Sequence, residues 1–409
     1  MVNTHSPNYL VKQRMLQNKP ALFGLGVILI TSLMAILGYL IMPDNTPNAN
    51  DGAIQLQKLM PGSRATFLKI RKNANVPDRN IFAEMLFGQP SAYLLVPISE
   101  YIIEDWQVRV KPYGEENWES YELANCVLPL FTGNLNEQPA GYQQPYTITG
   151  NTVRYRNFDG KLHNLAYSEL VDIFEDKNIE NRFYILGTDK SGRDIFSRLL
   201  YGARISLSIG LVSVLLSLVL GVTLGALGGF FGGWLDNLIM WFMSVVWSIP
   251  GIMLVIAISL ALQSRGIFVA FLAVGLTMWV DVARVVRGQI LGIKEKLFVE
   301  AARAYGLTNW QIIYSHILPN IVGSLIVIAT SNFAAAILLE AGLSFLGLSV
   351  QPPTPSWGIM IYEGYHAIGS PDSWHLIVLP ALAISIMVLS FNLLGNGLRD
   401  AFDPKTLLK

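Results

Sequence analysis

Six stretches of this chain are apolar and long enough to cross a lipid bilayer. They span residues 21–42, 205–230, 234–262, 267–291, 321–346 and 376–398. A helix needs about 20 such residues to cross the hydrocarbon core. Because lipid offers no hydrogen-bond partner to backbone amides, segments of this kind must be helical. The sequence therefore predicts an all-α polytopic membrane protein with six transmembrane helices, the first at 21–42 and five more within 205–398.

Charged side chains gather between the first and second spans. Residues 43–186 hold 31 of the 58 charged side chains, although they make up about a third of the chain. Strand-like segments lie at 106–110 and 147–156, and a helix-like segment lies at 167–176. We therefore expect an inserted extracytoplasmic α+β domain at 43–186, followed by an interfacial helical segment at 187–204.

Two features predict how the spans are shaped and packed. Gly221 and Gly225 form a G-x-x-x-G pattern, which lets two membrane helices approach closely. The dipeptide Pro250-Gly251 lies inside the third span, and proline interrupts the helical hydrogen-bond ladder. The second span is therefore expected to pack tightly on a neighbour, and the third to be kinked.

The basic residues predict an orientation for the spans. Five of them lie in the segment 295–318 or shortly before it, namely Arg284, Arg287, Lys294, Lys296 and Arg303, whereas the loop 347–375 has no lysine or arginine. By the positive-inside rule, the segment 295–318 and both ends of the chain, 1–20 and 399–409, lie in the cytoplasm. Four basic residues within 188–204 disagree, but the rule is weak beside a long domain.

The segment 295–318 is amphipathic and too short to cross a bilayer. Phe298, Ala301, Ala302 and Tyr305 are spaced as one stripe of a helix, and Gly306 suits the position after its end. A T-x-x-Q capping box at 308–311 then begins a second helix, whose stripe is Trp310, Ile313, Tyr314 and Ile317. Such a pair of short helices can pack on its own subunit or fill a groove on a partner.

Four motifs taken together resemble one transporter family. They are LGTDKSGRDIFSRLLYGARISL at 186–207, EAARAYG at 300–306, LEAGLSFLGLSVQPPTPSWGIM at 339–360 and FNLLGNGLRDAFDP at 391–404. The region 186–403 is similar to the inner-membrane permease subunits of ATP-binding-cassette importers for dipeptides, oligopeptides and nickel, and most similar to the C-type permease of that group. The domain at 43–186 is a departure, because relatives have a much shorter segment there.

The resemblance implies a permease fold, a set of partners and a docking role for one segment. The partners are a second permease, two cytoplasmic ATPases and an extracytoplasmic substrate-binding protein, with the chain in a bacterial inner membrane. The segment 295–318 would be the coupling region that sits in a groove of an ATPase. The docking residues carried over are Glu300, Ala301, Ala302, Gly306, Leu318 and Pro319. The family pattern has an apolar residue where this chain has His316.

Three further residues are weaker candidates for the pathway or its gate. Asp281 and Glu340 are ionisable groups inside spans, where such groups are functional candidates. A structural pair of Asp281 with Arg284, and packing of Glu340 against Ser344, are the competing interpretations. Trp357 follows a proline-rich outer loop and suits an interfacial, structural or gating rim.

The sequence predicts no catalytic residue, cofactor or metal site. It has one cysteine, five scattered histidines and no phosphate-binding loop, so ATP would be bound by the partner ATPases. The expected function is transport of dipeptides or oligopeptides. Nickel or oligosaccharides remain open as substrates. A membrane receptor or sensor whose domain at 43–186 binds a ligand is the alternative from another class. Within a transporter, that domain could dock the binding protein or be a passive elaboration.

Overall fold

The computed structural model describes residues 7–74, 76–130, 145–157, 161–264, 266–369 and 373–402. The chain forms two compact units, a membrane unit and an inserted unit. The membrane unit comprises Met1–Ile36, Tyr201–Tyr365 and Ile377–Lys409, and the inserted unit comprises Leu37–Leu200 and His366–Leu376.

The long apolar helices confirm the predicted fold class. Five helical stretches are long and apolar enough to cross a membrane: α2 (Lys19–Ile41), α6 (Ile195–Phe231), α9 (Ile267–Ile293), the stretch Asn309–Phe345 that ends in α12 (Leu318–Phe345), and α14 (His375–Phe402). A sixth span results if the bent pair α7 (Gly233–Trp247) and α8 (Gly251–Ala261) is counted as one. A short helix, α1 (Pro7–Gln17), precedes α2.

The third apolar stretch is broken rather than gently kinked. α7 and α8 meet at an angle of 93°. Pro250 is the residue before α8 and has extended backbone angles, φ −54° and ψ 130°. Because proline has no amide hydrogen and disfavours helical geometry in the residue before it, the helix ends there. The kink expected at Pro250 is therefore a complete break between two helices.

The second span begins earlier than the apolar pattern suggests. α6 starts at Ile195 because Asp194 accepts a hydrogen bond from the Ser197 backbone amide at 2.8 Å and so caps the helix. The segment expected to be a separate interfacial helix, 187–204, is divided between a loop and the first turns of α6.

Glycines bring α6 and α9 close together, as the G-x-x-x-G pattern predicts. A Cβ added at Gly221 would lie 2.4 Å from the Cβ of Val282, and one at Gly225 would lie 2.5 Å from the carbonyl oxygen of Ala283. Neither side-chain carbon could fit without moving α9. The two helices are therefore in backbone contact along this stripe.

The inserted unit contains two antiparallel sheets, in agreement with the predicted α+β class. One has the strand order β4-β3-β2-β1-β8 and the other the order β5-β6-β7. Their bounds are β1 (Ser63–Arg71), β2 (Tyr93–Glu104), β3 (Gln107–Pro112), β4 (Glu119–Glu122), β5 (Tyr146–Thr149), β6 (Thr152–Arg156), β7 (Leu162–Ala166) and β8 (Ile179–Tyr184). Among the described residues, three α-helices accompany them, α3 (Ile81–Phe87), α4 (Leu123–Val127) and α5 (Tyr167–Lys177).

A hydrophobic core joins the larger sheet to α4 and α5. Its buried residues come from β1, β2, β3, α4, the segment just after α4, β5, β6 and α5, and include Leu68, Ile98, Val108, Cys126, Val153 and Phe174. The inward side chains of β3 alternate with exposed ones, which is the period of a strand with one buried face. The inserted unit therefore has a core of its own, separate from the apolar packing of the spans.

Candidate partner-docking surface

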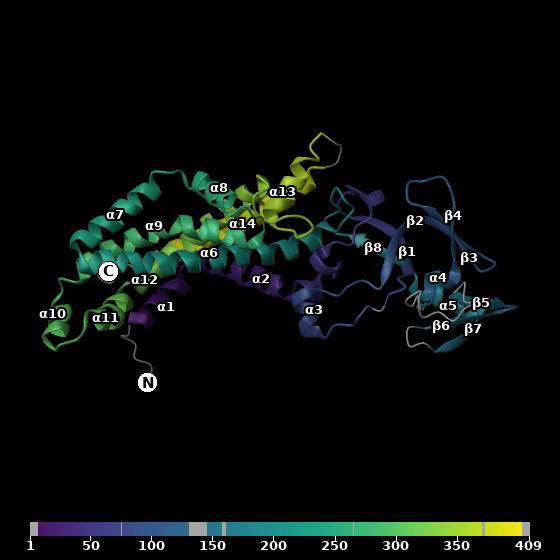
Figure 1. Ribbon diagram of the computed structural model, residues 1–409, viewed down its shortest axis with the longest axis horizontal. Helices are drawn as coiled ribbons and strands as arrows, with labels where there is room; N and C mark the ends of the chain where they lie inside the picture. The colour runs from purple at the N-terminus through teal and green to yellow at the C-terminus, as the bar shows by residue number, and fades with distance from the viewer. Residues whose placement is uncertain are drawn as a thin grey trace. The chain divides into compact units, whose positions relative to one another are not determined.

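A short helical hook, residues 295–318, follows α9. It consists of α10 (Leu297–Ala304), α11 (Asn309–Ile312) and a π-helical turn (Ile313–Ile317). Figure 1 shows the hook at the same end of the membrane unit as α1 and the end of α14, and α13 (Trp357–Tyr365) at the other end. Arg14 on α1 donates a hydrogen bond to the carbonyl of Ala401 at 3.4 Å, which brings these two ends of the chain together.

The inner face of the hook packs on its own subunit. Val299 and Ala302 of α10 are buried, and so are Ile312, Ile313 and Ile317. They belong to one apolar cluster with residues of α6 and α9, namely Ala226, Phe230, Val282, Val286 and Ile290. The hook is thus held on the ends of two spanning helices by buried apolar surface.

The outer face of the hook is aromatic and exposed. The exposed fractions are 89% for Tyr305, 52% for Trp310, 64% for Tyr314 and 82% for Leu297. Trp310 and Tyr314 stack on each other with ring centroids 6.1 Å apart. Large contiguous apolar patches on water-exposed protein surfaces are commonly interaction sites.

The predicted stripes are divided between these two faces. On α10, Ala302 is buried, whereas Phe298, Ala301 and Tyr305 are exposed. The hook has two arms, α10 and the second helical segment formed by α11 and the π-helical turn. In the second arm, Ile313 and Ile317 are buried, whereas Trp310 and Tyr314 are exposed. Both arms carry apolar residues around most of their circumference, so periodicity alone could not select the buried side.

The turn between the two arms has the predicted geometry. Gly306 has φ +79°, a value that side chains disfavour. Thr308 and Gln311 form the capping box: the Thr308 amide donates to Oε1 of Gln311 at 2.8 Å, and the Gln311 amide donates to Oγ1 of Thr308 at 3.4 Å. The positive φ and the cap fix the angle at which the second arm leaves the first.

The hook joins α12 through a π-helical turn. The Leu318 amide donates to the carbonyl of Ile313, one residue further back than in an α-helix. Pro319 follows in the first turn of α12 and has no amide to donate, which accounts for the irregular ladder. His316, the departure from the family pattern, lies within this turn and is half-buried.

The six residues assigned to docking by resemblance lie together on the hook and at its junction with α12. Leu318 is half-buried and Ala302 is buried. The other four are exposed, namely Glu300, Ala301, Gly306 and Pro319. The exposed aromatic residues Tyr305, Trp310 and Tyr314 lie between the first and the last of them in the sequence. Sequence reasoning had placed these three in the apolar stripes, which could pack on the subunit or fill a partner's groove, and had not included them among the docking residues.

Asp281 and Arg284 do not form the structural pair considered above. Both are exposed on α9, and the guanidinium of Arg284 lies 3.9 Å from the centroid of the Trp247 ring. The ion pair of this region joins α7 to α9 instead. Arg287 donates from two nitrogens to the two carboxylate oxygens of Asp236, at 2.6 and 2.7 Å. A two-point contact of this type fixes the relative position of the two helices.

Glu340 is fully buried at the centre of a serine cage. Its Oε1 accepts from the hydroxyls of Ser344 at 2.7 Å and Ser356 at 2.9 Å, and its Oε2 accepts from Ser206 at 3.2 Å. The contact with Ser344 is the one predicted from the spacing. The other two serines come from α6 and from the residue before α13, so the carboxyl joins three parts of the membrane unit.

Trp357 is part of the same arrangement. It is buried at the first position of α13, and its amide donates to the Ser206 hydroxyl oxygen at 3.3 Å. Ser356 caps α13 by accepting from the Ile359 amide at 3.2 Å. The tryptophan that we expected at an interfacial rim is therefore a packing residue within the described membrane unit.

The loop before α6 carries a buried charge cluster that sequence reasoning did not assign. The carboxylate of Asp189 accepts from Nε of Arg193 at 2.7 Å and lies 3.3 Å from Nε of Arg198, which is 1% exposed. Burial raises the pKa of the neighbouring Asp194 carboxyl, and hydrogen bonds from Ser197 oppose that rise. The charges of the loop are paired with one another and with Arg198 in the first turn of α6, which gives the motif at 186–207 a structural role.

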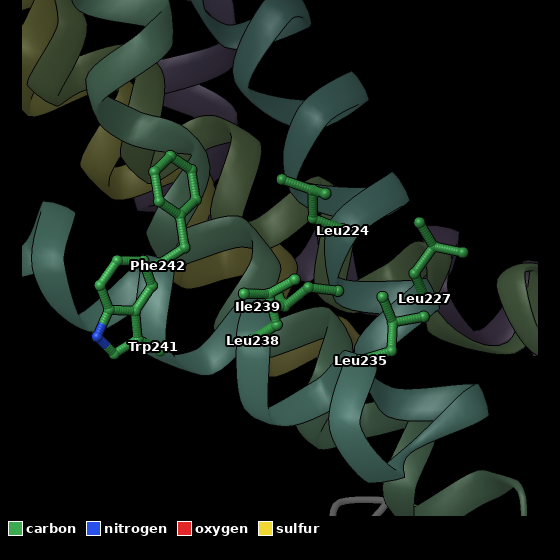
Figure 2. A pocket seen from close by; sticks show the side chains of 7 residues that line it. All are labelled: Leu224, Leu227, Leu235, Leu238, Ile239, Trp241 and Phe242. Atoms are coloured by element: carbon green, nitrogen blue, oxygen red, sulfur yellow. The ribbon is translucent and has the colours of Figure 1, made fainter.

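An apolar groove runs between α6 and α7. It has a volume of about 380 Å³ and is lined by Leu224, Leu227, Leu235, Leu238, Ile239, Trp241 and Phe242 (Figure 2). A peptide needs placed polar partners for its amides and charges, and this lining offers only the indole nitrogen. We do not assign the groove as a substrate site.

The apolar spanning helices mark the chain as an integral membrane protein, and its likeness to known proteins identifies the class. Residues 221–408 match the sequence model of the family described as binding-protein-dependent transport system inner membrane component. Residues 6–61 match the N-terminal transmembrane domain of oligopeptide transport permease C. The chain belongs to this family of inner membrane components, in agreement with the resemblance, and it is a permease subunit of an ABC importer. All strands of the inserted unit lie between the two matched stretches.

The match to this chain covers most of the length of its curated relatives. The glutathione transport system permease protein GsiD of Pectobacterium atrosepticum is 45% identical over 220 residues, which are 54% of this chain and 72% of that protein. The protein of the same name from Shigella flexneri serotype 5b is 49% identical, over 54% and 71%. Among solved structures, an inward-facing MetNI methionine ABC transporter chain is 22% identical, covering 51% of this chain and 97% of that chain, with a TM-score of 0.43.

Proposed function

We propose that this chain moves small peptides across the inner membrane and that its hook docks on a cytoplasmic ATPase. It would pair with a second permease, and two ATPases and an extracytoplasmic binding protein would complete the importer. The pathway would run between the two permeases. ATP binding and hydrolysis would displace the hook, and the spans would rock between inward and outward access.

The observation that carries the docking proposal is the division of the hook into two apolar faces. One face is buried against α6 and α9, and the other exposes Tyr305, Trp310 and Tyr314. A purely structural turn would not need the second face. Aromatic residues held rigidly on a short helix are typical anchors for a groove on a partner.

The charge pattern supports a cytoplasmic position for the hook. Arg303 and Lys296 lie in it, and Arg284, Arg287 and Lys294 lie near the end of α9 that leads into it. The loop 347–375, which includes α13 at the other end of the membrane unit, has no lysine or arginine. The positive-inside rule then places both termini and the hook in the cytoplasm, with the inserted unit outside.

The substrate proposal rests on sequence similarity to known transport permeases. The relatives reported above are named as glutathione transport permeases, and one matched family model is named for oligopeptide transport. Glutathione is a tripeptide, so both names describe short peptides. Competition of peptide uptake by nickel or by oligosaccharides would identify the other substrate classes.

The docking proposal predicts that Tyr305→Ala abolishes most transport. A central aromatic anchor contributes about 2 kcal/mol or more to an interface, so we expect coupling to the ATPase to weaken about thirtyfold. The measurement is uptake of a labelled short peptide by cells that express the whole importer, with membrane levels of the chain checked by immunoblot.

The matched control is Phe268→Ala. Phe268 is 80% exposed at the opposite end of α9, against 89% for Tyr305. This control removes an equally exposed aromatic ring far from the hook and should leave uptake unchanged. Equal uptake by the two variants, at equal membrane levels, would refute docking through this face.

A further inference from the structure

The short helix α3 of the inserted unit exposes four large apolar side chains. The exposed fractions are 68% for Ile81, 76% for Phe82, 55% for Leu86 and 63% for Phe87. Ile81, Phe82 and Leu86 lie within an arc of about 140° on a helical wheel, which Met85 shares, and Phe87 ends the helix. Seven residues with this much exposed apolar surface are costly to leave in water.

Contacts within the inserted unit tie α3 to the end of α2. The Asn45 side chain, just past α2, donates to Oε1 of Glu84 at 2.9 Å, and the Gln89 amide donates to the Asn45 carbonyl at 2.8 Å. Gly88 lies against Tyr39 so closely that an added Cβ would be 2.8 Å from the ring. The helix is therefore held beside Tyr39 and Asn45, which lie in and just past the last turn of α2.

The position of that last turn sets the depth of α3. α2 has 23 residues and so is about 35 Å long, slightly more than the hydrocarbon core of about 30 Å. Its last turn, with Tyr39, then lies at the boundary between hydrocarbon and headgroups, where tyrosine is enriched. Tyr39 also accepts a hydrogen bond from the Asn48 amide at 2.9 Å, which holds the following linker in place.

The polar side chains in and just before α3 have hydrogen-bond partners within the protein. Glu84 bonds Asn45, the Asn80 side chain caps the helix by accepting from the Ala83 amide at 2.8 Å, and the Arg79 guanidinium donates to the carbonyls of Phe87 and Gly88. Ile81, Phe82 and Leu86 are left as an apolar edge with no charged side chain in it.

We propose that α3 is an interfacial membrane anchor whose edge, Ile81, Phe82 and Leu86, inserts among the lipids of the bilayer that α2 spans. The occupant of this surface is phospholipid acyl chain and glycerol backbone. A short helix with one apolar face, lying in the interface plane, is the usual form of such an anchor. The anchor fixes the start of the inserted unit at the membrane surface.

A spin label placed at the edge tests the proposal directly. In the full chain reconstituted in lipid nanodiscs, Phe82→Cys is labelled with a nitroxide, and its collision rates with oxygen and with a water-soluble nickel chelate are compared. Oxygen partitions into lipid and the chelate does not. We expect a several-fold higher oxygen-to-nickel ratio for Phe82→Cys than for a control label at Ile148→Cys on β5, which is 43% exposed.

The native thiol does not interfere with this labelling. Cys126 is fully buried in the core, and burial raises the pKa of its thiol to about 12, so it carries almost no reactive thiolate near pH 7. Ile81→Cys provides a second label on the same edge if Phe82→Cys is produced poorly.

Two results would overturn the proposal. One is an oxygen-to-nickel ratio at positions 82 and 81 equal to that of the control, which means that the edge lies in water. The other is a ratio typical of water in the chain alone, with nickel collisions that become rarer only when an extracytoplasmic partner protein is added. That result would mean that the edge is a protein-docking surface.

Discussion

At the scale of single residues, Glu340 illustrates what a sequence can and cannot show. An ionisable residue inside an apolar span is easily recognised, and the spacing to Ser344 indicates one hydrogen bond. The other two partners, Ser206 and Ser356, belong to different parts of the chain. No periodicity connects them to Glu340, so the three-part cage emerges only from the fold.

We predict that Glu340→Ala destabilises the membrane unit and that Glu340→Gln does so much less. The alanine variant leaves the buried hydroxyls without their common acceptor and opens a cavity, at a cost of about 2 kcal/mol or more. Glutamine keeps the volume and one carbonyl acceptor. The thermal midpoint of unfolding in detergent measures both, and equal midpoints for wild type and the alanine variant would contradict the role of the cage.

At the scale of helices, sequence motifs predicted that a contact or a break occurs but not which helix is the partner. The G-x-x-x-G pattern indicated a close contact on α6, and Pro250 indicated a disturbed third span. Neither signal named the neighbour or the size of the effect: the neighbour of α6 is α9, and the break is 93°. Within the hook, likewise, the capping box at Thr308 was readable, but the buried side of each arm was not.

The α6–α9 contact predicts a difference between two alanine substitutions. Gly225→Ala places a Cβ 2.5 Å from the Ala283 carbonyl, so α9 must shift, at a cost of about 1–3 kcal/mol. Gly26→Ala on α2 has no heavy atom within 4 Å of its new Cβ. We expect the first to lower the thermal midpoint in detergent and the second to leave it unchanged or slightly higher. Identical midpoints for both would argue against the close packing.

For the whole molecule, composition and apolar runs were sufficient to predict a polytopic membrane protein with an inserted α+β domain. The strand order could not be predicted. β1 pairs with β8 although Ser63 and its partner Tyr184 are separated by most of the inserted unit, and pairing over such a distance leaves no short-range pattern. The partners of the hook also stay a prediction, because a docking surface is completed only by another chain.

The central claim is that the hook couples this permease to an ATPase. The most direct test is a mild-detergent pull-down of the tagged chain from cells expressing the whole importer, with mass spectrometry and ATPase assay of the eluate, for wild type and Gly306→Pro. Proline holds φ near −65°, whereas this position has +79°, so the variant disrupts the turn between the two arms. We predict that wild type retains a second permease and active ATPases, and that Gly306→Pro retains the permease but loses the ATPases. A wild-type chain recovered alone or as a homo-oligomer without ATPase activity, in a detergent that preserves a known transporter, would contradict the account.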